Sequence, residues 1–211
     1  MVTVLQLAGR LKTYYLSFNS FGPVSAMNTV SFINMADGTA EDYAFLHDEE
    51  QTYMHTLPDR LLRSLEELEH SFSGYKVSRL EHSLQSATRA FQAGEPEEMV
   101  VAALLHDIGD GLAPSSHSEM AAAILRPYVS ERIYWIVRHH GLFQSYYYAH
   151  HYGKDRNARD RHKDHPWYQD TIDFCEKYDQ NCFDPEFESK PLSFFEPMVR
   201  RIFSKPIFDT I

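Results

Sequence analysis

The chain has 211 residues, 43% of them hydrophobic, and a formal net charge of −10 at pH 7. A chain of this length can bury one full-sized core, so we expect one domain, with or without an N-terminal appendage. The acidic balance argues against a surface that binds nucleic acid or an anionic membrane. The two cysteines lack a zinc-type partner spacing, and no apolar run reaches the about 20 residues of a membrane span. We therefore expect a cytoplasmic protein without a disulfide framework.

The N-terminal segment differs in charge from the rest of the chain. Up to Asp37 it contains no acidic residue and only two basic ones. Two basic residues are few for an organelle transit segment. We expect residues 1–45 to be a poorly structured extension, or to include translation from an upstream start with Met27 or Met35 as the natural first residue. Residues 46–211 are then expected to form the folded domain.

After Pro58 the sequence predicts a succession of helices. Leucines at 61, 62, 65 and 68 repeat with the period of an amphipathic helix. Further helices are predicted from Ser78 to about Gly94, from Pro96 to Gly109, from Ser116 through MAAAILRPY, from Ser130 to Gly141, and over 168–181 and 193–203. The three serines are expected to cap their helices, the first two within the capping boxes SRLE and SHSE. No useful β-alternation is present, so we predict an all-α domain.

The segment 144–166 is rich in aromatic and charged residues and has no helical period. It is predicted to be a long ordered loop, and loops of that length are usually functional or disordered. Its four histidines are His150, His151, His162 and His165. We expect them to be solvated or to belong to a lid, and not to bind a metal.

The stretch AALLHDIGDG, residues 102–111, ends an apolar helix on the polar pair His106 and Asp107. A buried carboxylate costs several kcal/mol unless it is paired or bound to a metal. A structural histidine–aspartate pair, or a cap of the helix end, would also explain these residues. Metal-ligating side chains elsewhere in the chain would favour a metal site.

Four further side chains can point inward from other helices, as ligands do in the metal sites of helix bundles. They are His82, His117, His140 and Asp179. Each alone is more often a core or capping residue, but the order H…HD…H…H…D is a specific pattern. His139, beside His140, is a competing ligand candidate.

The stretches LEHSLQSA at 80–87 and AALLHDIG at 102–109 resemble those of phosphonate-cleaving oxygenases with an HD domain. Over roughly residues 72–181 the chain resembles the HD-domain superfamily, in the branch that also contains myo-inositol oxygenase. The resemblance implies an all-α HD-domain helical bundle with a two-metal centre in its core. It implies one metal held by His82, His106, Asp107 and Asp179, and a second held by Asp107, His117 and His140. Adjacent helical residues point about 100° apart, which is compatible with His106 serving one ion while Asp107 spans both.

Oxygenases of this branch use two iron ions in the mixed-valence Fe(II)/Fe(III) state, and a donor set of nitrogen and oxygen also suits manganese. The resemblance thus implies a small-molecule substrate and dioxygen as partners, with cleavage of a C–C or C–P bond of a small hydroxylated metabolite. HD-type phosphohydrolases share the ligand order and use their metals to activate a water. Hydrolysis of a phosphomonoester or nucleotide is therefore the alternative, and a non-catalytic binding module is a third. The sequence predicts no oligomeric state.

Three residues depart from the pattern of the branch. Asp110 stands where relatives carry lysine or histidine, and it would welcome a cation or a hydroxyl donor, unless it is a loop carboxylate without a role. Gln144 replaces a basic residue that helps to hold phosphonate, but it still forms hydrogen bonds. Tyr75 replaces a glutamate that recognises an ammonium group; its ring could bind a quaternary ammonium or belong to the core. We expect Asp110 and Gln144 in catalysis, and these two with Tyr75 in substrate binding. No lysine or arginine is expected near the metals, unless arginines of segment 144–166 fold over them.

Overall fold

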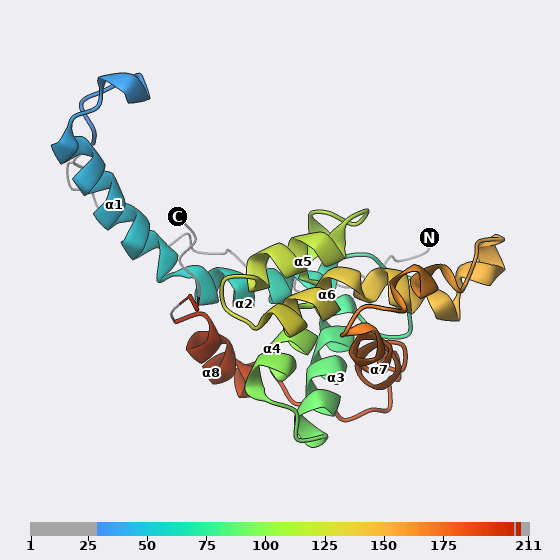
Figure 1. Ribbon diagram of the computed structural model, residues 1–211. Helices are drawn as coiled ribbons and strands as arrows, with labels where there is room; N and C mark the ends of the chain where they lie inside the picture. The colour runs from blue at the N-terminus through green and yellow to red at the C-terminus, as the bar shows by residue number, and fades with distance from the viewer. Residues whose placement is uncertain (1–28, 205, 208–211) are drawn as a thin grey trace, which may run out of the picture. The chain divides into compact units, whose positions relative to one another are not determined.

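The computed structural model describes residues 29–204 and 206–207. These residues form α-helices and 3-10 turns with no β-strand among them, which confirms the predicted all-α class (Figure 1). None of the helices in these ranges is long and apolar enough to cross a bilayer. The chain divides into two compact units, residues 1–49 and 50–211. The expected start at Met27 lies outside the described residues, and the boundary between 45 and 46 stays a prediction.

The first unit contains a 3-10 turn, Met35–Asp37, and the beginning of α1 (Ala40–Met54). Asp42 organises the start of this helix, because its carboxylate accepts hydrogen bonds from the backbone N–H of Thr39 at 3.0 Å and of Ser31 at 2.8 Å. These hydrogen bonds lower the pKa of Asp42 to about 2. No residue of α1 is buried, so the helix has no apolar face that the sequence analysis could have detected.

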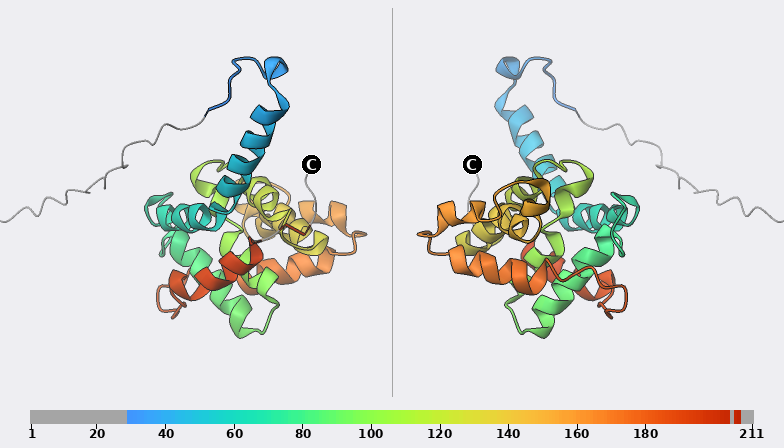
Figure 2. Two further views of the ribbon diagram at one scale, coloured as in Figure 1. Left: turned by 90° about the vertical axis from the view of Figure 1, so that its left-hand side faces the viewer. Right: turned by 90° about the vertical axis from the view of Figure 1, so that its right-hand side faces the viewer.

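In the described part of the second unit, seven helices follow the end of α1: α2 (Leu57–Glu67), α3 (Arg79–Gln92), α4 (Glu97–Leu105), α5 (His117–Leu125), α6 (Glu131–Gln144), α7 (Tyr168–Tyr178) and α8 (Leu192–Ile202). Helix α4 packs against α3, α6 and α8, while α5 packs along α6 (Figures 1 and 2). Helix α7 contacts both α3 and α6. The elements that carry the predicted ligands are therefore neighbours.

Helix α4 is the central helix, since every residue from Met99 to Leu105 is buried. Such a helix is apolar on all sides and delivers the next two residues, His106 and Asp107, into the core. Helix α3 begins as predicted, because the Ser78 hydroxyl accepts the backbone N–H of Glu81 at 3.0 Å.

Ser116 and Ser130 are the N-cap residues of α5 and α6, as predicted, but the expected capping hydrogen bonds to their side chains are not formed. The Glu98 carboxylate of α4 instead accepts the backbone N–H of Ser130 at 3.0 Å and its hydroxyl at 3.1 Å. A carboxylate from another helix therefore takes the place of a local cap, and this partner has no signature in the local sequence.

Several predicted helix ends also differ. Helix α4 ends at Leu105 and not at Gly109, and α5 ends at Leu125 and not at Tyr128. Helix α6 does not stop at Gly141 but continues to Gln144. A Cβ at Gly141 would lie 2.7 Å from the Ser118 hydroxyl, so the glycine permits close packing of α6 on α5. Helix α7 ends at Tyr178, so Asp179 follows the helix and does not lie on it. The predicted loop after α6 contains three 3-10 turns, Ser145–Tyr147, Ala149–Tyr152 and Ala158–His162.

Candidate metal centre

The six side chains predicted as ligands come from three helices, α3, α5 and α6, and from the ends of two others, α4 and α7. The structure brings all of them together. They form two groups. The first contains His82, His106, Asp107 and Asp179, and the second contains Asp107, His117 and His140. In each group the potential ligand atoms lie within 4.8 Å of one another. Asp107 belongs to both groups. The side chain of His117 is 26% exposed, whereas those of the other five residues are at most 5% exposed.

Asp107 faces the two groups with different carboxylate oxygens. Its Oδ2 lies 3.2 Å from Nε2 of both His82 and His106. Its Oδ1 lies 3.4 Å from Nε2 of His117 and 3.2 Å from Nε2 of His140. This is the arrangement that a carboxylate between two cations requires.

The four imidazoles share one tautomer. Each Nδ1 contacts a backbone carbonyl oxygen: His82 that of Cys182 at 3.0 Å, His106 that of Ala103 at 2.7 Å, His117 that of Pro114 at 3.4 Å, and His140 that of Val137 at 2.6 Å. A carbonyl oxygen only accepts hydrogen bonds, so each Nδ1 carries the proton and each Nε2 presents a lone pair to the centre. In neutral rings, Nε2 of His82 and Nε2 of His106 would oppose two lone pairs across 3.1 Å, a contact that a metal ion, or a proton on one of the rings, relieves.

Asp179 completes the first group. Its Oδ1 lies 3.5 Å from Nε2 of His82 and 3.7 Å from Nε2 of His106. Its Oδ2 is buried without a hydrogen-bond partner, which is costly for a carboxylate oxygen. The unpartnered oxygen and the opposed lone pairs both fit a bound metal ion. A nitrogen and oxygen set without thiolate suits iron or manganese.

The charges of the centre show what balances the carboxylates when no metal is bound. Burial disfavours the charged form of His106, yet Asp107 and Asp179 raise the pKa of this imidazole well above its usual range. Burial likewise opposes ionisation of Asp107, yet His106 and Arg79 hold the pKa of this carboxyl well below its usual range. A proton and a guanidinium thus supply the positive charge that metal ions would otherwise provide.

Arg79 is the residue that the sequence analysis missed, and the expectation of no lysine or arginine near the ligands is wrong. Its Nη2 donates to Asp107 Oδ2, and its Nε donates to Asp110 Oδ2 at 2.7 Å. The residue is only 7% exposed. The signal was present in the sequence: Arg79 is the first helical residue after the Ser78 cap and precedes His82 by three positions, which places the two on one helix face.

The three predicted substrate and catalytic residues lie at different distances from the ligands. Asp110 is paired with Arg79, and its Oδ1 is 3.5 Å from Nδ1 of His117. Gln144 donates from Nε2 to Asp179 Oδ1 at 3.0 Å. Tyr75 is 52% exposed and is separated from His82 by one aromatic ring, Phe183, on which it stacks at 4.6 Å. Their roles in binding or catalysis stay predictions.

His139 points away from the two groups. Its Nδ1 contacts the backbone carbonyl of Trp135 at 2.9 Å, and its ring stacks on the Trp135 ring at 3.6 Å. Burial is the main cause that lowers its pKa. The His165 ring also stacks on the Trp135 ring, with the ring centres 3.3 Å apart. Within the described residues, no histidine of segment 144–166 joins either ligand group.

Replacement of the adjacent histidines should therefore have opposite effects on metal content. We expect His140→Ala to lose metal, because it removes a ligand of the second group, and His139→Ala to keep a wild-type content. Metal analysis of the two purified variants measures this directly. A loss of one equivalent in His139→Ala alone would show that the assignment of the pair is inverted.

Gln144 should act on the metal through Asp179. Because outer hydrogen-bond partners orient ligating carboxylates, we expect Gln144→Ala to weaken metal affinity about 10- to 100-fold. Gln169→Ala is the control, since this exposed amide donates a hydrogen bond to Asp173, which belongs to neither ligand group. Metal titration monitored by calorimetry checks the effect; equal affinities in the two variants would contradict it.

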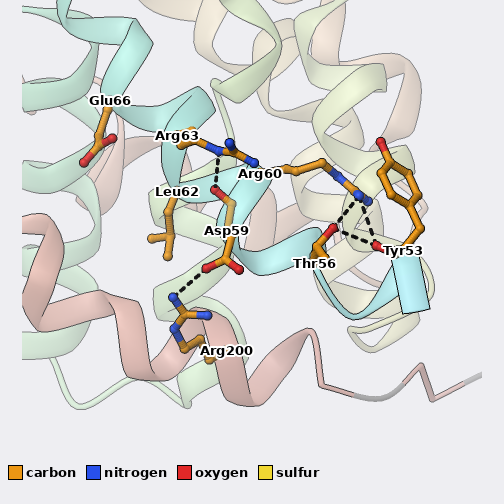
Figure 3. Close-up of a pocket in the computed structure, with 8 residues that line it drawn as sticks. All are labelled: Tyr53, Thr56, Asp59, Arg60, Leu62, Arg63, Glu66 and Arg200. Atoms are coloured by element: carbon orange, nitrogen blue, oxygen red, sulfur yellow. Dashed lines mark hydrogen bonds and ion pairs between the residues drawn. The ribbon is translucent and has the colours of Figure 1, made fainter. Parts of the chain in front are cut away.

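A pocket lies elsewhere on the second unit (Figure 3). It is an open depression of about 790 Å³ whose lining includes three arginines, Arg60, Arg63 and Arg200. Arg200 pairs with Asp59 at 2.7 Å, and Arg60 lies over the Tyr53 ring at 3.8 Å. It has no histidine or cysteine in its lining. This pocket offers a polar surface but no donor set for a metal.

Comparison with known proteins agrees with the geometry of the site. Residues 79–172 match the family model of the HD domain, so this part of the chain is an HD domain. The matched segment holds five of the six clustered side chains; Asp179 lies beyond its end.

A relative from Leisingera caerulea is similar to part of the chain. It is a [1-hydroxy-2-(trimethylamino)ethyl]phosphonate dioxygenase (glycine-betaine-forming), and it is 37% identical over 86 residues. The match covers 36% of this chain and 44% of the relative, so the chain spans less than half the length of the protein that it resembles.

Proposed function

We propose that the protein is a metal-dependent oxygenase that uses two iron ions and dioxygen to cleave a C–C or C–P bond of a small hydroxylated metabolite. The observation that carries this proposal is the Asp107 carboxylate, which faces two groups of ligand atoms with its two oxygens. The partial similarity to a phosphonate dioxygenase favours oxygen chemistry over hydrolysis.

Each side chain of the centre has a defined task in this proposal. Four imidazoles and two carboxylates would hold the pair of ions, and the backbone carbonyls on Nδ1 fix the orientation of the rings. When bound, the ions supply the electrons for oxygen activation and a positive charge for the substrate oxygens. Gln144 holds Asp179, and the buried α4 keeps water from the closed side of the centre.

The proposal is tested by purification without oxygen, followed by metal analysis. We expect iron in the protein, an electron paramagnetic resonance signal of a mixed-valence pair after partial reduction, and a change of that signal on addition of a hydroxylated phosphonate. Oxygen uptake should then accompany loss of the substrate. Hydrolysis of phosphomonoesters with manganese, without oxygen uptake, would instead establish the phosphohydrolase alternative.

A further inference from the structure

Arg79 combines three properties that a residue serving only to balance the charge of Asp107 does not need. It is buried at the metal centre, a carboxylate outside the ligand set orients it, and it has donors to spare. Its exposed fraction is 7%, and its Nε is held by Asp110 Oδ2 at 2.7 Å. Asp110 is not a member of either ligand group.

The hydrogen bonds that the structure records for Arg79 use Nε and Nη2 only. When a metal ion neutralises Asp107, the contact between Nη2 and this carboxylate loses much of its attraction, whereas the contact to Asp110 remains. Because the Nε edge is occupied by Asp110, the edge formed by Nη1 and Nη2 is left for another partner. Two parallel N–H donors on one edge match the two oxygens of a phosphonate or carboxylate.

The centre is accessible from the side on which this pair lies. The side chains of His117 and Asp110 are 26% and 15% exposed, and Nδ1 of His117 is 3.5 Å from Asp110 Oδ1. Arg79 connects this open side to the buried Asp107. A ligand that reaches the metals from solvent would therefore pass the guanidinium.

The neighbouring aromatic rings do not favour a second cation at this place. The guanidinium carbon of Arg79 is 5.4 Å from the centre of the Tyr75 ring and 5.9 Å from that of Phe183. These rings thus already face a positive charge, and Asp110 is already paired. The polar groups of the open side are arranged for an anion and not for an ammonium.

We propose that Arg79, oriented by Asp110, binds the anionic group of the substrate beside the metal centre. The substrate class is then a small hydroxy acid whose phosphonate or carboxylate group contacts the guanidinium edge. That the bound anion is a substrate rests on the proposed function, but anion binding at Arg79 is measurable without any reaction. Asp110 is a positioning residue in this arrangement.

The test measures binding to manganese-loaded protein under anaerobic conditions, with hydroxymethylphosphonate and glycolate as separate probes in a calorimeter. The variants are Arg79→Gln, Arg79→Lys and Asp110→Asn. Arg132→Gln is the matched control, because it removes the same charge from an ion pair with Asp170 on the half-exposed face of α6. Metal content and thermal unfolding are recorded for every variant.

We expect Arg79→Gln to weaken binding of at least one probe about 10- to 100-fold, as loss of a charge-assisted contact implies. Arg79→Lys should lie between this variant and the wild type, because a lysine keeps the charge but loses the fork. Asp110→Asn should weaken binding less, and Arg132→Gln should not. The probe that loses more affinity identifies phosphonate or carboxylate as the preferred group.

Wild-type affinity in a metal-loaded Arg79→Gln would overturn the inference, as would an equal loss in Arg132→Gln. If Arg79→Gln does not fold or load metal, the other two variants decide: wild-type affinity in both Arg79→Lys and Asp110→Asn also overturns it. A separate assay of the iron-loaded wild type in the presence of oxygen tests the oxygenase. Lack of oxygen uptake there, with the expected order of affinities retained, would refute the oxygenase and leave the anion site in place.

Discussion

Asp107→Asn is expected to lose both metal equivalents and to reduce activity by at least about 100-fold, more than the loss of an outer hydrogen-bond partner. The reason is that Asp107 is the only side chain common to the two ligand groups in the described part of the chain. The metal-free variant should also unfold more easily, because Arg79 and the imidazoles lose their buried counter-charge. Breaking a buried ion pair costs about 3–5 kcal/mol, and the remaining contact to Asp110 places the expected cost at the lower end.

Metal analysis and urea unfolding of the metal-free proteins measure the two effects separately. Asp173→Asn is the matched control, since it removes the same charge from an exposed pair with Lys177. This control should keep its metals and its stability within about 0.5 kcal/mol. Full metal occupancy in Asp107→Asn would refute the bridging position of this carboxylate.

The second large effect is expected at Gly109, which follows Asp107 by two positions. A Cβ at this residue would lie 2.7 Å from both the Cα and the carbonyl oxygen of His117. These are backbone atoms and cannot swing aside, so Gly109→Ala must push the start of α5 away. We expect a loss of about 1–3 kcal/mol in the free energy of unfolding, and loss of metal from the group that contains His117.

Gly111 provides the comparison, because it lies with Gly109 in one 3-10 turn, Ile108–Gly111. A Cβ there would meet no atom within 4 Å, so Gly111→Ala should leave metal content and stability unchanged. Unfolding curves and metal analysis of both variants test the contrast. Equal behaviour of the two alanine variants would mean that the close approach of the turn to α5 does not position His117.

The helices of the second unit were largely predictable, because burial of an apolar face leaves a period in the sequence. Helix α1 was not, since it buries no residue and carries no such period. The ends of α6 and α7 were misplaced for another reason: Gly141 serves contact with α5 and does not terminate its helix. The cap at Ser130 comes from Glu98, which is remote in sequence.

The clustered histidines and aspartates were predictable from their order along the chain, because this order matches the ligand order of the superfamily that the chain resembles. Arg79 was not recognised, although it precedes His82 by one helical turn. A charged residue at the first position of a helix usually faces solvent, and only the positions of Asp107 and Asp110 show that this one is drawn inward. Long-range ion pairs of this kind leave no local pattern.

The uneven cover of the two ligand groups has a consequence for how the protein is handled. His82 and His106 are fully enclosed, whereas His117 is reached by water. A chelator should therefore strip the centre in two phases, first from the side of His117 and much later from the enclosed side. Dialysis and affinity tags that compete for metals would then yield a half-loaded form, folded but inactive, and the remaining ion would mark the enclosed position.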